Sequence, residues 1–147
     1  MTDLRTHLSL DHLRTMTRVD HLLDSPEAGV RSDVLSALRQ ELSAHHQAEQ
    51  EVVYSALARR GGEAELLALE GQEEHELLER ILLSLASSGK KDAPRWTARC
   101  RMLKAYLQHH FEEEEREVFD LLGRIFTQRE LDDLGLMFEG AKQVLIH

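Results

Sequence analysis

Hydrophobic residues recur every three or four positions along almost the whole chain, which is the spacing of helices with one buried face. A few segments rich in Pro, Gly and Ser divide this pattern into successive stretches. No run of alternating β-branched residues predicts a strand. The pattern predicts four main helices, at about residues 3–23, 31–60, 63–85 and 94–126, and a short fifth helix at about 128–145.

Local signals mark where these helices begin and end. A Ser-Pro-Glu-Ala-Gly segment at 25–29 ends the first helix, and Gly61-Gly62 is a strong stop after the second. Pro94 is tolerated in the first turn of the fourth helix, and Thr127 with Glu130 has the spacing of a capping box. Long helices joined by short loops predict an all-α fold, an up-down-up-down four-helix bundle with a short C-terminal fifth helix.

Composition narrows the class of protein. The chain has 147 residues, of which 41% are hydrophobic, and we expect one folded domain spanning 1–147. A formal charge of −9 argues against nucleic acid as a partner, because its phosphates would be repelled. Apolar runs fall far short of the roughly 20 residues that cross a membrane, and the charged N-terminal segment does not resemble a signal peptide. Cys100 is the only cysteine, which fits a reducing compartment, so we expect a cytoplasmic protein.

A segment of the second predicted helix recurs in the fourth, 65 positions further along the chain. His45 and Glu49 match His110 and Glu114, so each of these helices carries a His-x-x-x-Glu motif. Residues four apart lie on one helix face, where an imidazole and a carboxylate can converge on one point. The apolar positions match as well: Leu42 with Leu107, Val53 with Val118, Tyr54 with Phe119, and Leu57 with Leu122.

Both motifs lie on the apolar stripe, so Glu49 and Glu114 are predicted to point into the bundle. A buried ionised carboxylate without a partner costs on the order of several kcal/mol, and two such groups facing each other repel. Cations between them would remove both penalties. The neighbouring Glu112, Glu113 and Glu115 are instead expected to face water, as on an ordinary solvated helix face.

One histidine on each remaining helix completes a possible set of metal ligands. His12 lies on the stripe of the first helix, and His75 lies on that of the third. Four imidazoles and two carboxylates suit iron or manganese, and would also accept zinc or copper. The candidate metal ligands are His12, His45, Glu49, His75, His110 and Glu114.

This order of residues resembles the hemerythrin or HHE cation-binding family, over about Leu4 to Leu122. The resemblance implies two iron ions in a non-haem di-iron centre. It also implies that Glu49 and Glu114 bridge the irons and that the histidines are terminal ligands. A small partner such as O2, NO or peroxide is implied as well, in oxidative or nitrosative stress defence or in iron or oxygen sensing.

The chain departs from oxygen-carrying hemerythrins in two ways. Those proteins have a second histidine four residues before the ligand of the third helix, and that position here is Gly71. Their last helix uses a His-x-x-x-x-Asp spacing, where this chain has His-x-x-x-Glu. The chain is therefore more similar to the broader HHE group. One iron would have an incomplete shell, to be filled by water or by a substitute such as Glu79 or His46.

Three other functions fit the sequence less well. A ferritin-like iron oxidase or store uses Glu-x-x-His pairs, but no histidine here has a glutamate three residues before it. A metal-free helical interaction module would leave Glu49 and Glu114 on the core stripe unexplained. Zinc peptidases of the His-Glu-x-x-His type are disfavoured because that motif is absent from the sequence. Core packing is the expected role of Tyr54 and Phe119, with a hydrogen bond from Tyr54 to a ligand as the alternative.

Overall fold

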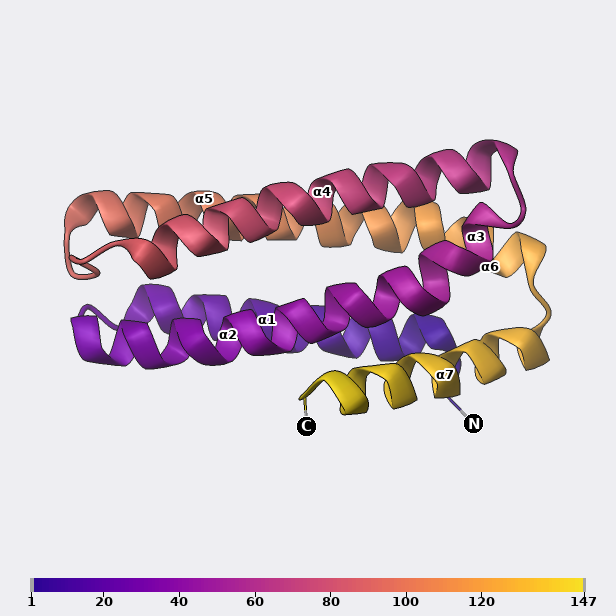
Figure 1. Cartoon of the computed structure of the whole chain (residues 1–147), viewed down its shortest axis with the longest axis horizontal. Helices are drawn as coiled ribbons and strands as arrows, with labels where there is room; N and C mark the ends of the chain where they lie inside the picture. Colours follow the sequence, from indigo (N-terminus) through magenta and orange to yellow (C-terminus); the bar gives the residue numbers. More distant parts are fainter. Residues whose placement is uncertain (1, 147) are drawn as a thin grey trace.

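In the computed structural model, residues 2–146 are described, and within that range the chain is helical with no strand (Figure 1). Two segments, η1 and η2, are single π-helical turns, and each joins an α-helix to a shorter continuation. The elements are α1 Leu4–Asp24, α2 Ala28–Glu49, η1 Gln50–Tyr54, α3 Ser55–Ala58, α4 Gly62–Ser87, α5 Pro94–Glu113, η2 Glu114–Val118, α6 Phe119–Ile125 and α7 Gln128–Ile146.

Four long helical rods make the bundle: α1, α2 with η1 and α3, α4, and α5 with η2 and α6. Successive rods run in opposite directions, with α1 and α2 in one layer and α4 and α5 in the other (Figure 1). Contacts between α1 and α2, α1 and α5, α4 and α5, and α2 and α4 close the bundle. The predicted all-α architecture is therefore confirmed, and α7 packs outside the bundle against α1 and α2.

Most helix boundaries lie within a few residues of the prediction. The main difference is the start of the second rod, because α2 begins at Ala28 and not near Arg31. Ala28 and Gly29 were expected in the loop, but they form the first turn of the helix directly after the Pro26-Glu27 segment. The C-terminal helix predicted at about 128–145 is confirmed as α7, which has 19 residues and lies along two rods of the bundle.

Local hydrogen bonds explain several of these ends. The Asp3 carboxylate accepts from the Arg5 backbone N–H at 2.8 Å and caps α1. Gly61 and Gly62 have φ of 67° and 56°, the left-handed conformation that ends the second rod without steric cost. The predicted capping box of α7 is present, since Thr127 and Glu130 exchange side-chain to backbone hydrogen bonds of 2.9 and 3.1 Å.

Both rods that carry the repeated motif contain one widened turn just after the motif. The Ser55 N–H bonds to the Gln50 carbonyl, and the Phe119 N–H bonds to the Glu114 carbonyl, five residues back instead of four. Single π turns of this kind occur frequently at functional sites. Neither turn was predicted.

The spacing of buried residues accounts for the widened turns. From His45 to Leu57, and again from His110 to Leu122, buried positions advance in three steps of four residues. A regular α-helix rotates roughly 400° over four residues, so three such steps would drift about 120° off one face. One wide turn absorbs much of this drift and keeps the carboxylate and the apolar residues beyond it on the inner face.

The apolar core consists of two clusters, one toward each end of the bundle. One cluster includes Leu8, Val53 and Leu122, and the other includes Leu42 and Leu107. Along each rod, the buried histidine and glutamate residues of the predicted metal site lie between the two apolar clusters, and we call them the polar layer. Apolar packing therefore fixes all four rods on both sides of this layer. No helix within residues 2–146 is long and apolar enough to cross a membrane.

Candidate metal centre

The six predicted ligand side chains all point inward and are almost completely buried. Their exposed fractions lie between 0% for Glu49 and 4% for Glu114. Each of the four rods contributes: α1 through His12, α2 through His45 and Glu49, α4 through His75, and α5 with η2 through His110 and Glu114. The structure therefore brings together the residues that sequence separates by up to about a hundred positions.

The side chains form two groups that share both carboxylates. In one group the ligand atoms of His12, His45, Glu49 and Glu114 lie within 4.8 Å of one another. In the other, those of His75 and His110 lie within the same limit of the two glutamates. Bonds from a metal ion to nitrogen or oxygen are about 2.0–2.2 Å long, so opposite ligands of one ion are about 4 Å apart. Each group is thus compatible with one ion, and the shared glutamates lie between the two positions.

Several atoms in this layer have no hydrogen-bond partner in the described part of the chain. They include His45 Nε2, His110 Nε2 and Glu49 Oε2. His45 Nε2 lies 3.8 Å from Glu49 Oε2, and His110 Nε2 lies 3.9 Å from Glu114 Oε2. These distances are too long for hydrogen bonds. Buried polar atoms are otherwise almost always satisfied, so the positions of these atoms fit a cation bound between them.

The outer nitrogens of three histidines are held by carboxylates. His45 Nδ1 lies 2.8 Å from Asp11, His12 Nδ1 lies 2.9 Å from Glu115, and His110 Nδ1 lies 2.5 Å from Glu74. A proton on Nδ1 leaves the lone pair of Nε2 facing the shared glutamates. Carboxylate–histidine pairs of this kind orient the ligands of known metal sites.

The contacts of these outer carboxylates with the histidines were not predicted from the sequence. Glu115 is exposed, as predicted, with 42% of its side chain accessible, but its carboxylate also reaches His12 and accepts a hydrogen bond from Ser9 at 3.3 Å. Asp11 is held in turn by Lys142 of α7, whose Nζ lies 2.8 and 2.9 Å from its two oxygens. The available signal was that Asp11 directly precedes His12 on the buried stripe of α1.

The position of Gly71 is occupied by Tyr54. A Cβ atom at Gly71 would lie 2.3 Å from the Tyr54 hydroxyl oxygen. That oxygen is 3.2 Å from Glu49, 3.2 Å from Glu114 and 3.3 Å from His75 Nε2. Tyr54 is therefore more than a packing residue, since its phenol reaches the shared carboxylates from the side where carriers have a histidine. The lack of a side chain at Gly71 makes this approach possible.

The two residues considered as substitutes lie elsewhere. Glu79 has a side chain that is 43% exposed and contacts His46 instead of the shared glutamates. The His46 ring is buried and stacks on His75 with a centroid distance of 3.7 Å. Its nitrogens lie near those of His75 and His110, to one side of the two glutamate-sharing groups.

Burial and charge set the protonation of the layer. Burial, and then repulsion by Glu114, raises the pKa of Glu49 well above its usual range. Burial acts on Glu114 in the same direction, but hydrogen bonds from His12 and Glu49 outweigh it and hold the pKa of Glu114 well below its usual value. Burial and the neighbouring His110 lower the pKa of His75 to about 3, so its imidazole is neutral and able to bind a metal ion.

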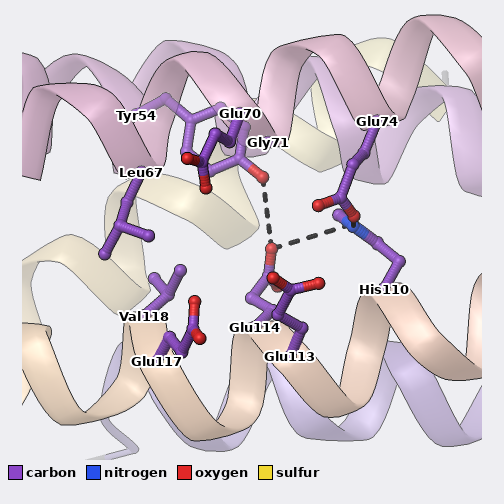
Figure 2. A pocket seen from close by; sticks show the side chains of 10 residues that line it. All are labelled: Tyr54, Leu67, Glu70, Gly71, Glu74, His110, Glu113, Glu114, Glu117 and Val118. Atoms are coloured by element: carbon purple, nitrogen blue, oxygen red, sulfur yellow. Dashed lines mark hydrogen bonds and ion pairs between the residues drawn. The ribbon is translucent and has the colours of Figure 1, made fainter.

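A small cavity of about 20 Å³ opens beside this layer between α4 and the α5–η2 rod. Figure 2 shows Tyr54 and His110 directed toward Glu114 at its inner end. Four further glutamates line it: Glu70, Glu74, Glu113 and Glu117. The volume is sufficient for about one water molecule.

The chain was compared with protein families, with curated proteins and with solved structures. The model of the hemerythrin HHE cation-binding domain matches residues 3–122, which include all six candidate ligands. No match was found among curated proteins or among solved structures. The family model covers most of the chain and implies cation binding, with iron as the expected metal. The matched range also contains the two His-x-x-x-Glu motifs described above. The chain belongs to the hemerythrin HHE cation-binding family.

Proposed function

We propose that this protein holds two iron ions and uses them to bind or react with a small ligand such as O2, NO or peroxide. The observation that carries this proposal is the sharing of Glu49 and Glu114 by two separate pairs of histidines. A carboxylate that belongs to both groups is placed to bridge two ions. A single ion would leave one histidine pair without a partner.

The proposed ligands follow from the two groups. His12 and His45 are the terminal ligands of one ion, and His75 and His110 are those of the other, with Glu49 and Glu114 as bridges. Tyr54 is the additional donor to the second ion, on the side of Gly71. Asp11, Glu74 and Glu115 fix the ring orientation of three of the histidines from behind.

When bound, iron with an open coordination position supplies affinity for small ligands and redox chemistry. The size and charge of the cavity beside Glu114 limit which molecules reach the metal. The cavity beside Glu114 accommodates about one water molecule, which suits a diatomic molecule or a peroxide. Glutamates at its mouth make the approach negatively charged, so neutral ligands are favoured over anions.

Tyr54 keeps its proton in the metal-free protein. Its hydroxyl is buried, and burial together with Glu49 and Glu114 raises its pKa well above the usual value. The metal-free protein therefore holds a neutral phenol whose proton is directed at the carboxylates. Binding of the second ion by the Tyr54 oxygen would release this proton.

Metal analysis after purification from iron-supplied cells tests the proposal. The wild-type protein is expected to contain close to two irons per chain, and Glu49→Gln or Glu114→Gln is expected to lose most of this iron. Glu112→Gln is the control, because this neighbouring carboxylate is exposed. Iron content unchanged in both inner variants, or equal loss in the control, would exclude the assigned bridges.

Absorption spectra of the iron-loaded protein test the second part of the proposal. Hydrogen peroxide and NO are expected to change the near-ultraviolet and visible bands, and azide is expected to act more weakly because it is an anion. Spectra that none of the three ligands changes would show that the irons are closed to exogenous ligands.

A further inference from the structure

A second polar region lies outside the six inner ligands, in a groove between α2 with η1 and α4. This groove has a volume of about 600 Å³ and is open to solvent. Its lining includes His46, Glu51, Glu76 and Glu79. The inner ligand His75 lines this groove, so the groove reaches the polar layer from the face between α2 and α4, next to the α4–α5 face that holds the Tyr54 cavity.

His46 is an unexplained residue at the floor of this groove. Its side chain is 5% exposed, and neither ring nitrogen has a hydrogen-bond partner among residues 2–146. Leaving two buried polar nitrogens unsatisfied is costly, at about 1–3 kcal/mol for each group. A histidine that only filled space beside His75 could be replaced by an apolar residue without this cost.

The distance from His46 to Glu79 matches that of the two His-x-x-x-Glu pairs of the inner layer. His46 Nδ1 lies 3.8 Å from Glu79 Oε1. The pairs His45–Glu49 and His110–Glu114 are separated by 3.8 and 3.9 Å, whereas the two inner pairs between different rods are separated by 3.0 and 3.1 Å. By contrast, the His45–Asp11 hydrogen bond is 2.8 Å long. A separation near 3.8 Å is too long for a hydrogen bond and fits two bonds of about 2.0–2.2 Å to a shared ion.

The order of residues on α4 supports the same assignment. Glu79 follows His75 by four residues, so α4 carries a third His-x-x-x-Glu sequence in addition to the two on α2 and α5. His75 turns inward to Glu49 at 3.0 Å, while Glu79 remains at the groove and meets His46 from the neighbouring rod. The pair thus joins two rods, as the inner ligands do.

Charge in the groove favours a cation. Glu51 and Glu76 lie near the pair and add to the negative charge of Glu79. Arg80 also lines the groove, and Arg39 acts on Glu79, so the excess of negative charge is moderate. An imidazole with carboxylates suits borderline divalent cations such as Fe²⁺, Mn²⁺, Co²⁺ or Zn²⁺ more than Mg²⁺ or Ca²⁺.

We propose that His46 and Glu79 form a third, outer site for a divalent transition-metal ion at the floor of this groove. The proposed site uses neither Glu49 nor Glu114, so metal binding there can be lost while the inner centre still binds its ions. Because His46 stacks on His75, an ion held there lies beside the inner layer without sharing its ligands.

Titration of the metal-free full-length protein with Co²⁺, followed by equilibrium dialysis and visible absorption, tests the outer site. The wild-type protein is expected to bind three ions per chain below about 1 mM free Co²⁺. Glu79→Gln and His46→Gln are each expected to bind two. Glu79 is half-exposed, so its replacement is expected to leave the fold intact, which circular dichroism checks.

The matched control is His109→Gln. His109 lies in an exposed pair with Glu113 at 3.0 Å, which is the geometry of an ordinary surface contact, and its side chain is 71% exposed. This variant is expected to bind three ions, like the wild type. Equal numbers of bound ions in the wild type and in Glu79→Gln would overturn the outer site, as would a loss of one ion in the control. Failure of the inner centre would be seen separately, as an unchanged ion count in Glu49→Gln.

Discussion

Glu49 and Glu114 are the residues whose burial needs an explanation, because each has almost no exposed surface and their carboxylates face each other. In the metal-free protein a proton reduces the repulsion, since the pKa of Glu49 is raised by burial and by Glu114. Bound cations would replace that proton. The same two residues thus make the metal-free site costly and the loaded site stable.

Replacement of Glu49 by Gln should therefore separate stability from metal binding. Burial and the nearby Glu114 raise the pKa of Glu49 and so favour its neutral form in the metal-free protein. The neutral Glu49→Gln is therefore expected to change the free energy of unfolding by less than about 1 kcal/mol. The rise in melting temperature that iron gives the wild type is expected to disappear. Urea denaturation of the metal-free proteins and thermal melts with and without iron measure the two effects. A large loss of stability without metal would contradict the assigned protonation.

Gly71 and Tyr54 form a second residue-level relationship that can be tested. Gly71→Ala is expected to cost roughly 1–3 kcal/mol, because the new Cβ would overlap the Tyr54 ring and hydroxyl. Gly140→Ala is the control: within residues 2–146 nothing lies within 4 Å of that Cβ position, and alanine is favoured in a helix. Chemical denaturation of both variants gives the comparison. Equal stabilities would show that the close approach of Tyr54 to Gly71 is not rigid.

At the scale of elements, the two π turns and α7 organise the polar layer. The π turns keep Glu49, Glu114 and the residues beyond them on the inner face. The α7 helix supplies Lys142, which is 6% exposed and holds Asp11 behind His45. A helix outside the bundle therefore contributes to the orientation of an inner histidine.

Loss of Lys142 is expected to affect both folding and metal binding. Lys142→Met removes the buried cation that binds Asp11 and leaves only the exposed Arg14 at 3.6 Å, at a cost of about 3–5 kcal/mol. It is also expected to weaken iron binding by about 10-fold or more. Lys104→Met is the control, because its pair with Asp20 is 40% and 52% exposed, and exposed pairs contribute about 0–1 kcal/mol. Denaturation and metal-competition titrations measure both quantities. Equal effects of the two substitutions would contradict the role given to α7.

Much at this scale could be predicted from sequence, for physical reasons. Helical periodicity and capping signals are local, so the rods and the capping box of α7 follow from nearby residues. The matching stripes of His45 and His110 predict which side chains point inward. The π turns also have a local signal in the sequence, because successive apolar positions beyond each motif are four residues apart, which a regular helix does not keep on one face.

Other features depend on distance in space and could not be predicted. Lys142 meets Asp11 across 131 positions of the chain, and no local pattern pairs them. Glu74 and Glu115 resemble solvated helix residues in sequence, and only the packing of neighbouring rods brings them to His110 and His12. Similarly, the approach of Tyr54 to Gly71 depends on the crossing of two rods and on the wide turn η1.

For the whole molecule, the two apolar clusters hold the rods on either side of the polar layer. Cys100 belongs to the cluster far from the C-terminal helix and is fully buried. Burial raises the pKa of its thiol from 9.0 to about 11. It is therefore a probe of the integrity of this end of the bundle.

Alkylation of Cys100 by iodoacetamide at pH 8 is expected to be at least about 100-fold slower in the folded than in the unfolded protein, because only the thiolate reacts. The sign of the pH effect follows from the raised pKa. Between pH 9 and about 11 the unfolded chain loses the thiol proton and the folded chain keeps it, so this thiol lowers stability as pH rises. Mass spectrometry after timed quenching measures the rate of Cys100 alkylation. Rapid labelling of the folded protein would show that the cluster opens readily.

Electron paramagnetic resonance of the oxidised, iron-loaded protein shows whether Glu49 and Glu114 bridge two irons. Two ferric ions joined by shared ligands couple their spins, so a sample shown by metal analysis to hold two irons per chain is expected to give almost no signal. A ferric signal that accounts for all of the iron would show separate, unbridged ions, and it would contradict the account.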